Sequence, residues 1–198
     1  MDHTAEQKKM TPFNTRAVAP NIWAIDNQFV NHFVLKHNAH WIAIDAGANA
    51  PLSLEGLSTI GITPSDISTV LLTHDHGDHT ALLAQFSQAN VYAFGETISN
   101  HPKLTNTQLA DGDTLDLHGL SVEVIHTPGH KANHVSFLLP AQGILFAGDS
   151  MSVQGGKAAL FNSVYNADDA QQQKDIDKQL ALNGVKVILT SHYGLLEL

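Results

Sequence analysis

The chain of 198 residues contains no cysteine, which excludes disulfide bonds, thiolate metal ligands and a cysteine nucleophile. It also has no apolar run of about 18 residues, so we expect no membrane-spanning segment and no membrane partner. Basic residues are scarce, because ten Lys and Arg stand against 19 Asp and Glu, for a formal net charge of −9. Such a chain is poorly suited to the phosphate backbone of nucleic acids, and a small-molecule substrate is the expected partner.

No repeat, low-complexity tract or proline-rich linker divides the chain, so its length predicts one main domain at residues 21–198. Residues 1–20 are polar and interrupted by proline, and we expect an N-terminal extension or an edge segment there. The first ten residues lack the apolar stretch of a signal peptide, which predicts a cytoplasmic protein.

Short runs rich in β-branched and aromatic residues, bounded by turn residues, predict strands. They lie at 21–25, 31–35, 41–44, 67–72, 91–94, 115–117, 120–125, 135–139, 143–147 and 185–189. Capping residues and apolar spacing predict helices at 49–61, 80–88 and 168–182. Strands in series with helices between some of them predict an α/β fold with more than one sheet.

Histidine is the residue that the chain has in excess, with 13 copies. His74, His76, Asp78 and His79 fall within six residues at the end of a predicted strand. Imidazole and carboxylate ligands suit zinc, iron or manganese. One tetrahedral ion cannot accept all four neighbours and keep an open position. We therefore expect two metal ions a few ångströms apart, with His74 and His76 directed at one and Asp78 and His79 at the other.

Three further candidate ligands close other predicted strands at turns. His130 follows a Pro-Gly turn after the strand at 120–125, Asp149 follows the strand at 143–147, and His192 follows the last predicted strand. Because strand ends meet at one edge of a layered sheet, we expect these side chains to converge on the histidine cluster.

The order of these motifs resembles the metallo-β-lactamase-fold superfamily over nearly the whole chain. The matching elements are Asn31-x-Phe33-Val34, Ile44-Asp45-Ala46-Gly47, Thr73-His74-x-His76-x-Asp78-His79, Thr127-Pro128-Gly129-His130, Phe146-Ala147-Gly148-Asp149 and Ser191-His192-Tyr193-Gly194. The resemblance implies a four-layer αββα sandwich, with the metals at one rim between the two sheets.

The resemblance also implies a ligand set for two divalent metal ions, with Zn²⁺ as the first expectation and Fe or Mn as alternatives. The first ion would be held by His74, His76 and His130, the second by Asp78, His79 and His192, with Asp149 bridging them. Asp45, by family position, would support the ligand loop from behind. His126 and His134 flank the Pro-Gly turn and are weaker candidates for the same kind of support.

Asp149 and the lack of cysteine set the chain apart from zinc β-lactamases, which have a cysteine or no bridging carboxylate at the corresponding place. The chain is more similar to glyoxalase II, lactonases and ribonuclease Z, and its negative charge disfavours the last of these. Because Leu198 follows so soon after His192, the chain is identified as a short glyoxalase II-like member without the C-terminal helical domain.

The resemblance implies a hydrolase in which a hydroxide between the metals attacks an ester, thioester or lactone carbonyl of a small molecule. Asp78 is the expected catalytic residue, since it can orient the water and carry its proton to the leaving group. The main alternative is a persulfide dioxygenase with one iron held by His74, His130 and Asp149. β-Lactamase and phosphodiesterase activities rank below both. Lys157 and Tyr193 are weaker candidates for contacts with substrate.

Overall fold

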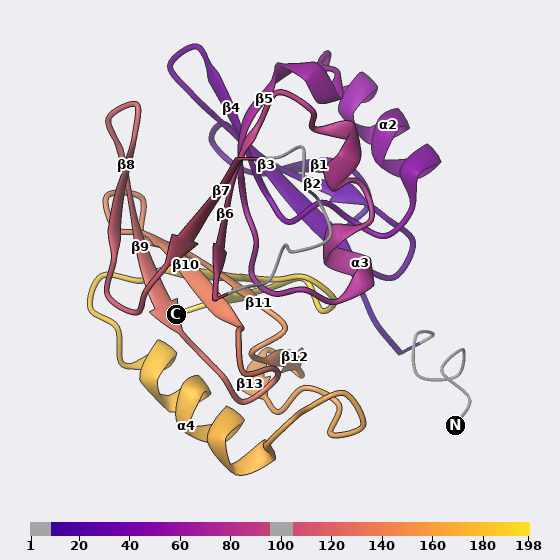
Figure 1. Cartoon of the computed structure of the whole chain (residues 1–198). Helices are drawn as coiled ribbons and strands as arrows, with labels where there is room; N and C mark the ends of the chain where they lie inside the picture. Colours follow the sequence, from indigo (N-terminus) through magenta and orange to yellow (C-terminus); the bar gives the residue numbers. More distant parts are fainter. Residues whose placement is uncertain (1–8, 96–104) are drawn as a thin grey trace.

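The computed structural model describes residues 9–95 and 105–198, and in this part of the chain two sheets pack face to face (Figure 1). The first sheet has seven described strands in sequence order. They are β1 (Arg16–Ala19), β2 (Ile22–Asp26), β3 (Asn31–His37), β4 (His40–Ile44), β5 (Ile67–Leu71), β6 (Asn90–Phe94) and β7 (Thr105–Leu109). Strands β4 to β7 run parallel to one another, so their carboxyl ends meet at the same edge.

The second sheet has six described strands in the order β15-β14-β11-β10-β9-β8. They are β8 (Thr114–Leu117), β9 (Leu120–His126), β10 (Val135–Leu139), β11 (Ile144–Gly148), β14 (Val187–Thr190) and β15 (Leu195–Glu197). β11 and β14 are parallel neighbours, which places the residues that follow them side by side. A separate hairpin is formed by β12 (Ser152–Gln154) and β13 (Lys157–Ala159).

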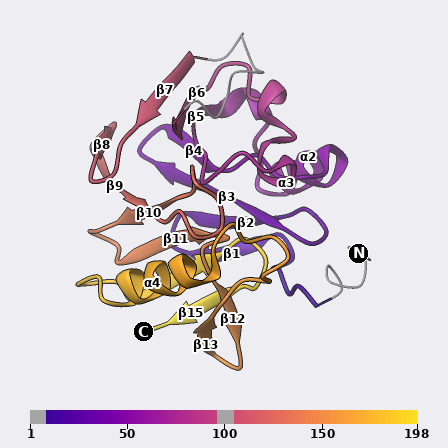
Figure 2. The same cartoon turned by 60° about the horizontal axis from the view of Figure 1, so that its bottom comes forward.

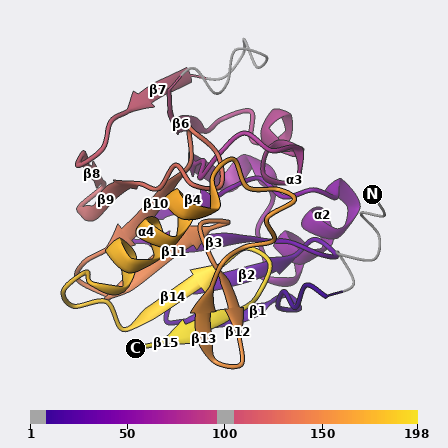
Figure 3. The same cartoon turned by 90° about the horizontal axis from the view of Figure 1, so that it is seen from below.

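Helices cover the outer face of each sheet, as Figures 2 and 3 show. α2 (Ala50–Thr59) and the short α3 (Gly77–Thr80) lie on the first sheet, and α4 (Asp169–Leu180) lies on the second. The facing sides of the sheets bury Phe33, Phe137 and Phe146 in one cluster. Two outer clusters lie beneath the helices, so the alternation of core-facing residues accounts for four layers. The αββα sandwich expected from the sequence is confirmed.

The prediction of a continuous helix at 80–88 is wrong. The chain instead forms α3 and then a single 3-10 turn, η2 (Leu83–Gln85); another, η1 (Pro64–Asp66), precedes β5. The backbone N–H groups of Ala81 and Leu82 donate to the carbonyls of Gly47 and Ala46 rather than to the preceding helical turn. Tertiary contacts with the neighbouring loop therefore override the local apolar spacing.

Several short strands at the edges carry no clear sequence signal. β1, β7, β15 and the hairpin β12–β13 were not among the predicted strands. β1 falls within residues 1–20 and pairs with β2 as the outermost strand of the first sheet, whereas residues 1–8 lie outside the described part. No helix within the described ranges is long and apolar enough to cross a membrane.

Gly129 lets the turn before His130 pack directly against α4. A Cβ atom at this position would meet the backbone nitrogen and Cα of Gln172. The turn is also held by a hydrogen bond from the Gly129 N–H to the Asp175 carboxylate, 2.7 Å long. We expect Gly129→Ala to lower the free energy of unfolding by about 1–3 kcal/mol, because neither backbone segment can give way easily.

Denaturant unfolding of metal-free protein measures this loss, with Gly77→Ala as the matched control. An added Cβ at Gly77 meets no atom within 4 Å, so the control should cost nothing. Equal stability of the two variants would contradict the close packing of the turn on α4.

Candidate metal centre

Seven side chains named from the sequence gather at one edge of the two sheets, in two groups whose candidate ligand atoms lie close together. The first group is His74, His76, His130 and Asp149. His76 Nδ1 lies 2.9 Å from His74 Nε2 and 3.1 Å from His130 Nε2. These nitrogens converge from the loop after β5 and from the turn between β9 and β10, as the strand ends predicted.

The second group is Asp78, His79 and His192. Asp78 Oδ2 lies 3.5 Å from His192 Nε2 and 3.8 Å from His79 Nε2. His79 and His192 are buried, whereas the Asp78 side chain is 24% exposed and faces a cavity. α3 begins at the residue before Asp78, so a short helical turn presents Asp78 and His79 to the same point.

Asp149 lies between the two groups. Its Oδ2 is 3.3 Å from His192 Nε2, 3.4 Å from His79 Nε2 and 3.5 Å from His130 Nε2. His74 Nε2 is slightly farther, at 3.8 Å. Ligand atoms around a tetrahedral zinc ion with bonds of about 2.0–2.1 Å are themselves about 3.3 Å apart. The spacing of these atoms therefore fits metal coordination better than direct hydrogen bonding.

Two buried atoms in this cluster have no hydrogen-bond partner, His79 Nε2 and Asp149 Oδ1. A polar atom left buried and unpaired costs about 1–3 kcal/mol, and more if charged. Both atoms belong to residues in the sets of candidate ligands, and cations bound by these residues could satisfy them. The donor set, five imidazoles and two carboxylates, is also one that divalent zinc, iron or manganese accepts. The residues present therefore fit two divalent cations.

In the second group, the Nδ1 atom of each histidine points away from the cluster and contacts a hydrogen-bond acceptor. His79 Nδ1 lies 2.8 Å from Asp45 Oδ2, and His192 Nδ1 lies 2.6 Å from the Phe29 carbonyl oxygen. A proton on each Nδ1 leaves the Nε2 lone pair directed into the site. The contact of Asp45 with His79 thus agrees with the supporting role expected for Asp45. The contact of the Phe29 carbonyl could not be predicted, because a backbone group gives no signal in the sequence.

His130 is oriented in the same way by Asn166, whose Oδ1 lies 3.1 Å from His130 Nδ1. The Asn166 amide is held in turn, because its Nδ2 donates to the side chains of Asp169 and Gln172 at 2.7 Å each. Sequence inspection missed Asn166, since it stands in a loop outside every recognised motif. α4 thus supports a candidate ligand through a chain of side-chain contacts.

His134 lies behind Asp149 and outside the candidate ligand sets. Its Nε2 accepts a 3.1 Å hydrogen bond from the Asp149 N–H, and its Nδ1 lies 2.8 Å from Thr127 Oγ1. Burial lowers the pKa of His134 well below its ordinary value, so the ring is neutral and can accept this bond. His126 instead contacts the Ala132 carbonyl away from the cluster.

The imidazoles of the first group are neutral. Burial lowers the pKa of His74 well below its ordinary value, with the nearby His79 adding to the effect. Burial also lowers the pKa of His130, and it lowers that of His76 to about 4. A neutral ring nitrogen is the form that binds a metal, so no proton has to be displaced from these three side chains at neutral pH.

The buried Asp149 carboxylate is stabilised by positive charge around it. Burial alone would raise the pKa of its carboxyl, yet His192 and His79 hold that pKa well below the usual range. In the reverse direction, burial opposes protonation of His79 and His192, but Asp149 raises the pKa of both. Divalent cations at the same place would provide the positive charge that these protons otherwise supply.

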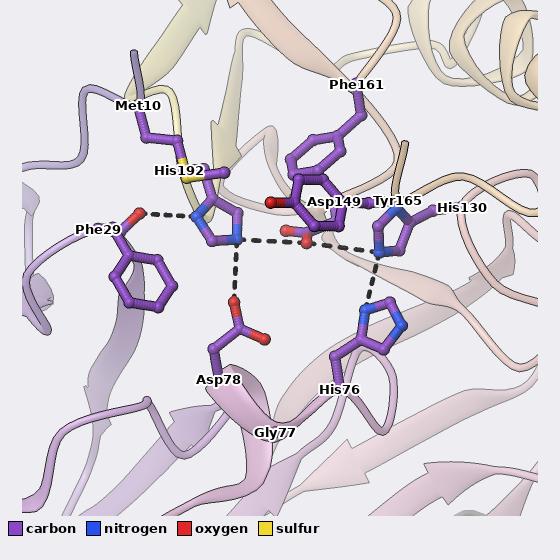
Figure 4. Close-up of a pocket in the computed structure, with 10 residues that line it drawn as sticks. All are labelled: Met10, Phe29, His76, Gly77, Asp78, His130, Asp149, Phe161, Tyr165 and His192. Atoms are coloured by element: carbon purple, nitrogen blue, oxygen red, sulfur yellow. Dashed lines mark hydrogen bonds and ion pairs between the residues drawn. The ribbon is translucent and has the colours of Figure 1, made fainter. Parts of the chain in front are cut away.

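A cavity of about 350 Å³ opens onto the cluster. Figure 4 shows His76, Asp78, His130, Asp149 and His192 on its floor and sides. Its remaining walls are mostly apolar, from Met10, Phe29, Phe161 and Tyr165. Tyr193, a candidate for substrate contact, is among the residues that line a neighbouring cavity, and Lys157 is exposed on β13. The site therefore has room for a small molecule beside the candidate ligands.

The chain belongs to the metallo-beta-lactamase superfamily, whose family model matches residues 25–192. The resemblance seen in the sequence motifs is thereby confirmed. Among solved structures, a metallo-beta-lactamase family protein from Thermus thermophilus superposes with a TM-score of 0.74 at 20% identity. That superposition covers 91% of this chain and 76% of the other.

Two relatives are similar to this chain in sequence. A hydroxyacylglutathione hydrolase from Aeromonas hydrophila is 33% identical over 164 residues, which cover 81% of this chain and 59% of the relative. An atrochrysone carboxyl ACP thioesterase from Aspergillus chevalieri is 27% identical over 154 residues, covering 75% of this chain and 48% of the relative. The chain thus spans about half to three fifths of the length of these relatives.

Asp149→Ala tests whether the buried carboxylate joins the two groups. We expect the metal content per chain to fall by at least one ion, because a candidate ligand that lies close to both groups is lost. Elemental analysis of protein purified without added metal or chelator measures this change. Asp177→Ala, which removes an exposed carboxylate from the outer face of α4, is the control. Unchanged metal content in Asp149→Ala would rule out the bridging position.

Asn166→Ala tests the support behind His130. Loss of the acceptor for His130 Nδ1 should weaken binding of the first metal about 10–100-fold, as removal of such supporting contacts does elsewhere. Competition with a chromogenic chelator measures the affinity. Asn183→Ala, at an exposed position after α4, should bind metal like the parent chain. Equal affinities of the two variants would show that Asn166 does not orient a ligand.

Proposed function

We propose that this chain is a dinuclear metallohydrolase that cleaves an ester, thioester or lactone carbonyl of a small molecule. His74, His76 and His130 would hold one divalent cation, and Asp78, His79 and His192 the other, with Asp149 between them. Zn²⁺ is the first choice for both positions, and Fe or Mn are alternatives. The thioester is the substrate class that we favour.

One observation carries the proposal: Asp149 Oδ2 lies 3.3–3.8 Å from four imidazole nitrogens drawn from both groups. A carboxylate in that position is suited to bridging two cations, and two adjacent cations are a recurring arrangement in hydrolases. The names of two relatives, a hydroxyacylglutathione hydrolase and an ACP thioesterase, support hydrolysis at a thioester. The cavity of about 350 Å³ supports a small substrate.

Bound divalent cations would supply two things: they would lower the pKa of water towards about 7, and they would polarise a carbonyl oxygen. Asp78 is the residue that handles the proton. Its carboxylate faces the cavity and is partly exposed, so it can accept the proton of the attacking water. The same carboxylate can then deliver that proton to the leaving sulfur or oxygen. Phe29 and Phe161 add apolar surface to the cavity beside these groups.

The neighbouring residues keep these groups in place during the reaction. Asp45 accepts a hydrogen bond from the Thr73 N–H at 2.8 Å and lies against His79 Nδ1, so it ties the end of β5 to the second group. The left-handed backbone of Asp45, with φ of 64°, aims the carboxylate back towards that loop. Fixed geometry of this kind lowers the reorganisation needed in the transition state.

The proposal predicts about two divalent cations per chain and hydrolysis of simple acyl thioesters without consumption of oxygen. Chelation should abolish the hydrolysis, and added Zn²⁺ should restore it. Elemental analysis, a thiol-release assay and an oxygen electrode measure the three quantities on one preparation. One iron per chain with oxygen uptake on a persulfide would overturn the proposal in favour of a persulfide dioxygenase.

A further inference from the structure

A segment before β1 lies beside the site and is tied to neighbouring segments by several hydrogen bonds. We call residues 10–15 the N-terminal strap. The Thr11 N–H donates to the carbonyl of His192 over 2.8 Å, which joins the strap to the turn that carries a candidate ligand. This segment precedes residue 25, where the match to the family model begins. The strap is therefore a feature of this chain beyond the matched region.

Asn31 fixes the strap a few residues later. Its Oδ1 accepts from the Phe13 N–H at 2.7 Å, and its Nδ2 donates to the Phe13 carbonyl at 2.8 Å. The Asn31 N–H donates in turn to the Ser191 carbonyl at 2.7 Å. Asn31 is buried and thus holds both segments, the strap through its side chain and the turn of His192 through its backbone N–H. Thr15 extends this frame by accepting a hydrogen bond from the Asp26 N–H.

The strap places Met10 in the wall of the cavity. Figure 4 shows the Met10 side chain alongside His192, with Phe161 on the same side of the cavity and Asp78 and His76 on the other. Met10, Phe29, Phe161 and Tyr165 form what we call the apolar wall. Methionine is flexible and polarisable, so it adapts to an apolar group of variable shape.

We propose that the apolar wall is an acyl subsite for straight-chain apolar acyl groups, and that Met10 on the N-terminal strap determines their preferred length. This inference rests on the proposed hydrolysis. Asp78 delivers the proton to the leaving group, so the leaving atom lies on the side of Asp78. The chain attached to the carbonyl carbon then points away from Asp78, towards Met10 and Phe161. Burial of its methylene groups against that wall stabilises the bound substrate.

Variants of Met10 test the length preference with acetyl and hexanoyl thioesters of one common thiol. Met10→Ala removes part of the wall, so the ratio of kcat/KM for hexanoyl over acetyl should fall about tenfold. Met10→Trp fills the cavity and should lower the same ratio further, because the long chain no longer fits. Leu54→Ala and Leu54→Trp, at a position 40% exposed on α2, are matched controls and should keep the parent ratio.

Binding can be followed without catalysis, because the chain has only three methionines. In zinc-loaded protein with ¹³C-labelled methionine methyl groups, the Met10 signal is assigned by its loss in Met10→Ala. Hexanoate should shift this signal, whereas acetate at the same concentration should shift it much less. The buried Met151 signal serves as an internal control.

These experiments distinguish failure of the proposed hydrolysis from failure of the proposed acyl subsite. If the parent chain hydrolyses neither thioester but hexanoate still shifts the Met10 signal, the proposed reaction is wrong and the apolar subsite stands. If both thioesters are hydrolysed, but the ratio is the same in all Met10 variants and hexanoate leaves the signal unmoved, the acyl subsite is wrong.

Discussion

The side chain of Asp149 is only 3% exposed, and its carboxylate lies among imidazole nitrogens that three different loops deliver. A buried charge costs several kcal/mol unless opposite charge and hydrogen bonds compensate it. The loops after β5, β9 and β14 must therefore meet at this carboxylate if the fold is to tolerate it. Parallel pairing of β11 with β14 brings Asp149 and His192 to the same edge of the sheet. The order of the strands thus places an imidazole beside the buried carboxylate.

Support for the cluster comes from both halves of the sandwich. Asp45, at the end of β4 in the first sheet, contacts His79, whereas Asn166, next to α4 on the second sheet, contacts His130. Each of these two contacts stays within one half, and the candidate ligands meet where the halves join. This arrangement explains why the candidate ligands gather at the rim between the sheets rather than in the middle of either sheet.

Much of this site could be predicted from the sequence, because its side chains lie in short motifs at the ends of strong strands. The loop of His74 to His79 is the clearest case, since four candidate ligands lie within six residues after the apolar β5. Edge strands such as β1 and β15 were missed because they are short and depend on pairing with a neighbour that local sequence does not encode. Asn166 was missed for a similar reason, as only the packing of its loop against the turn of His130 gives it a partner.

Phe29 contributes to the site in two independent ways, through its side chain and through its backbone carbonyl. Its side chain lines the cavity, while its carbonyl oxygen accepts from His192 Nδ1. Every amino acid has the same carbonyl, so substitution at this position can reshape the cavity and keep the acceptor for His192. The fold thereby lets one side chain of the cavity wall vary directly beside a candidate metal ligand, so the shape of the cavity can diverge without loss of the geometry at the centre.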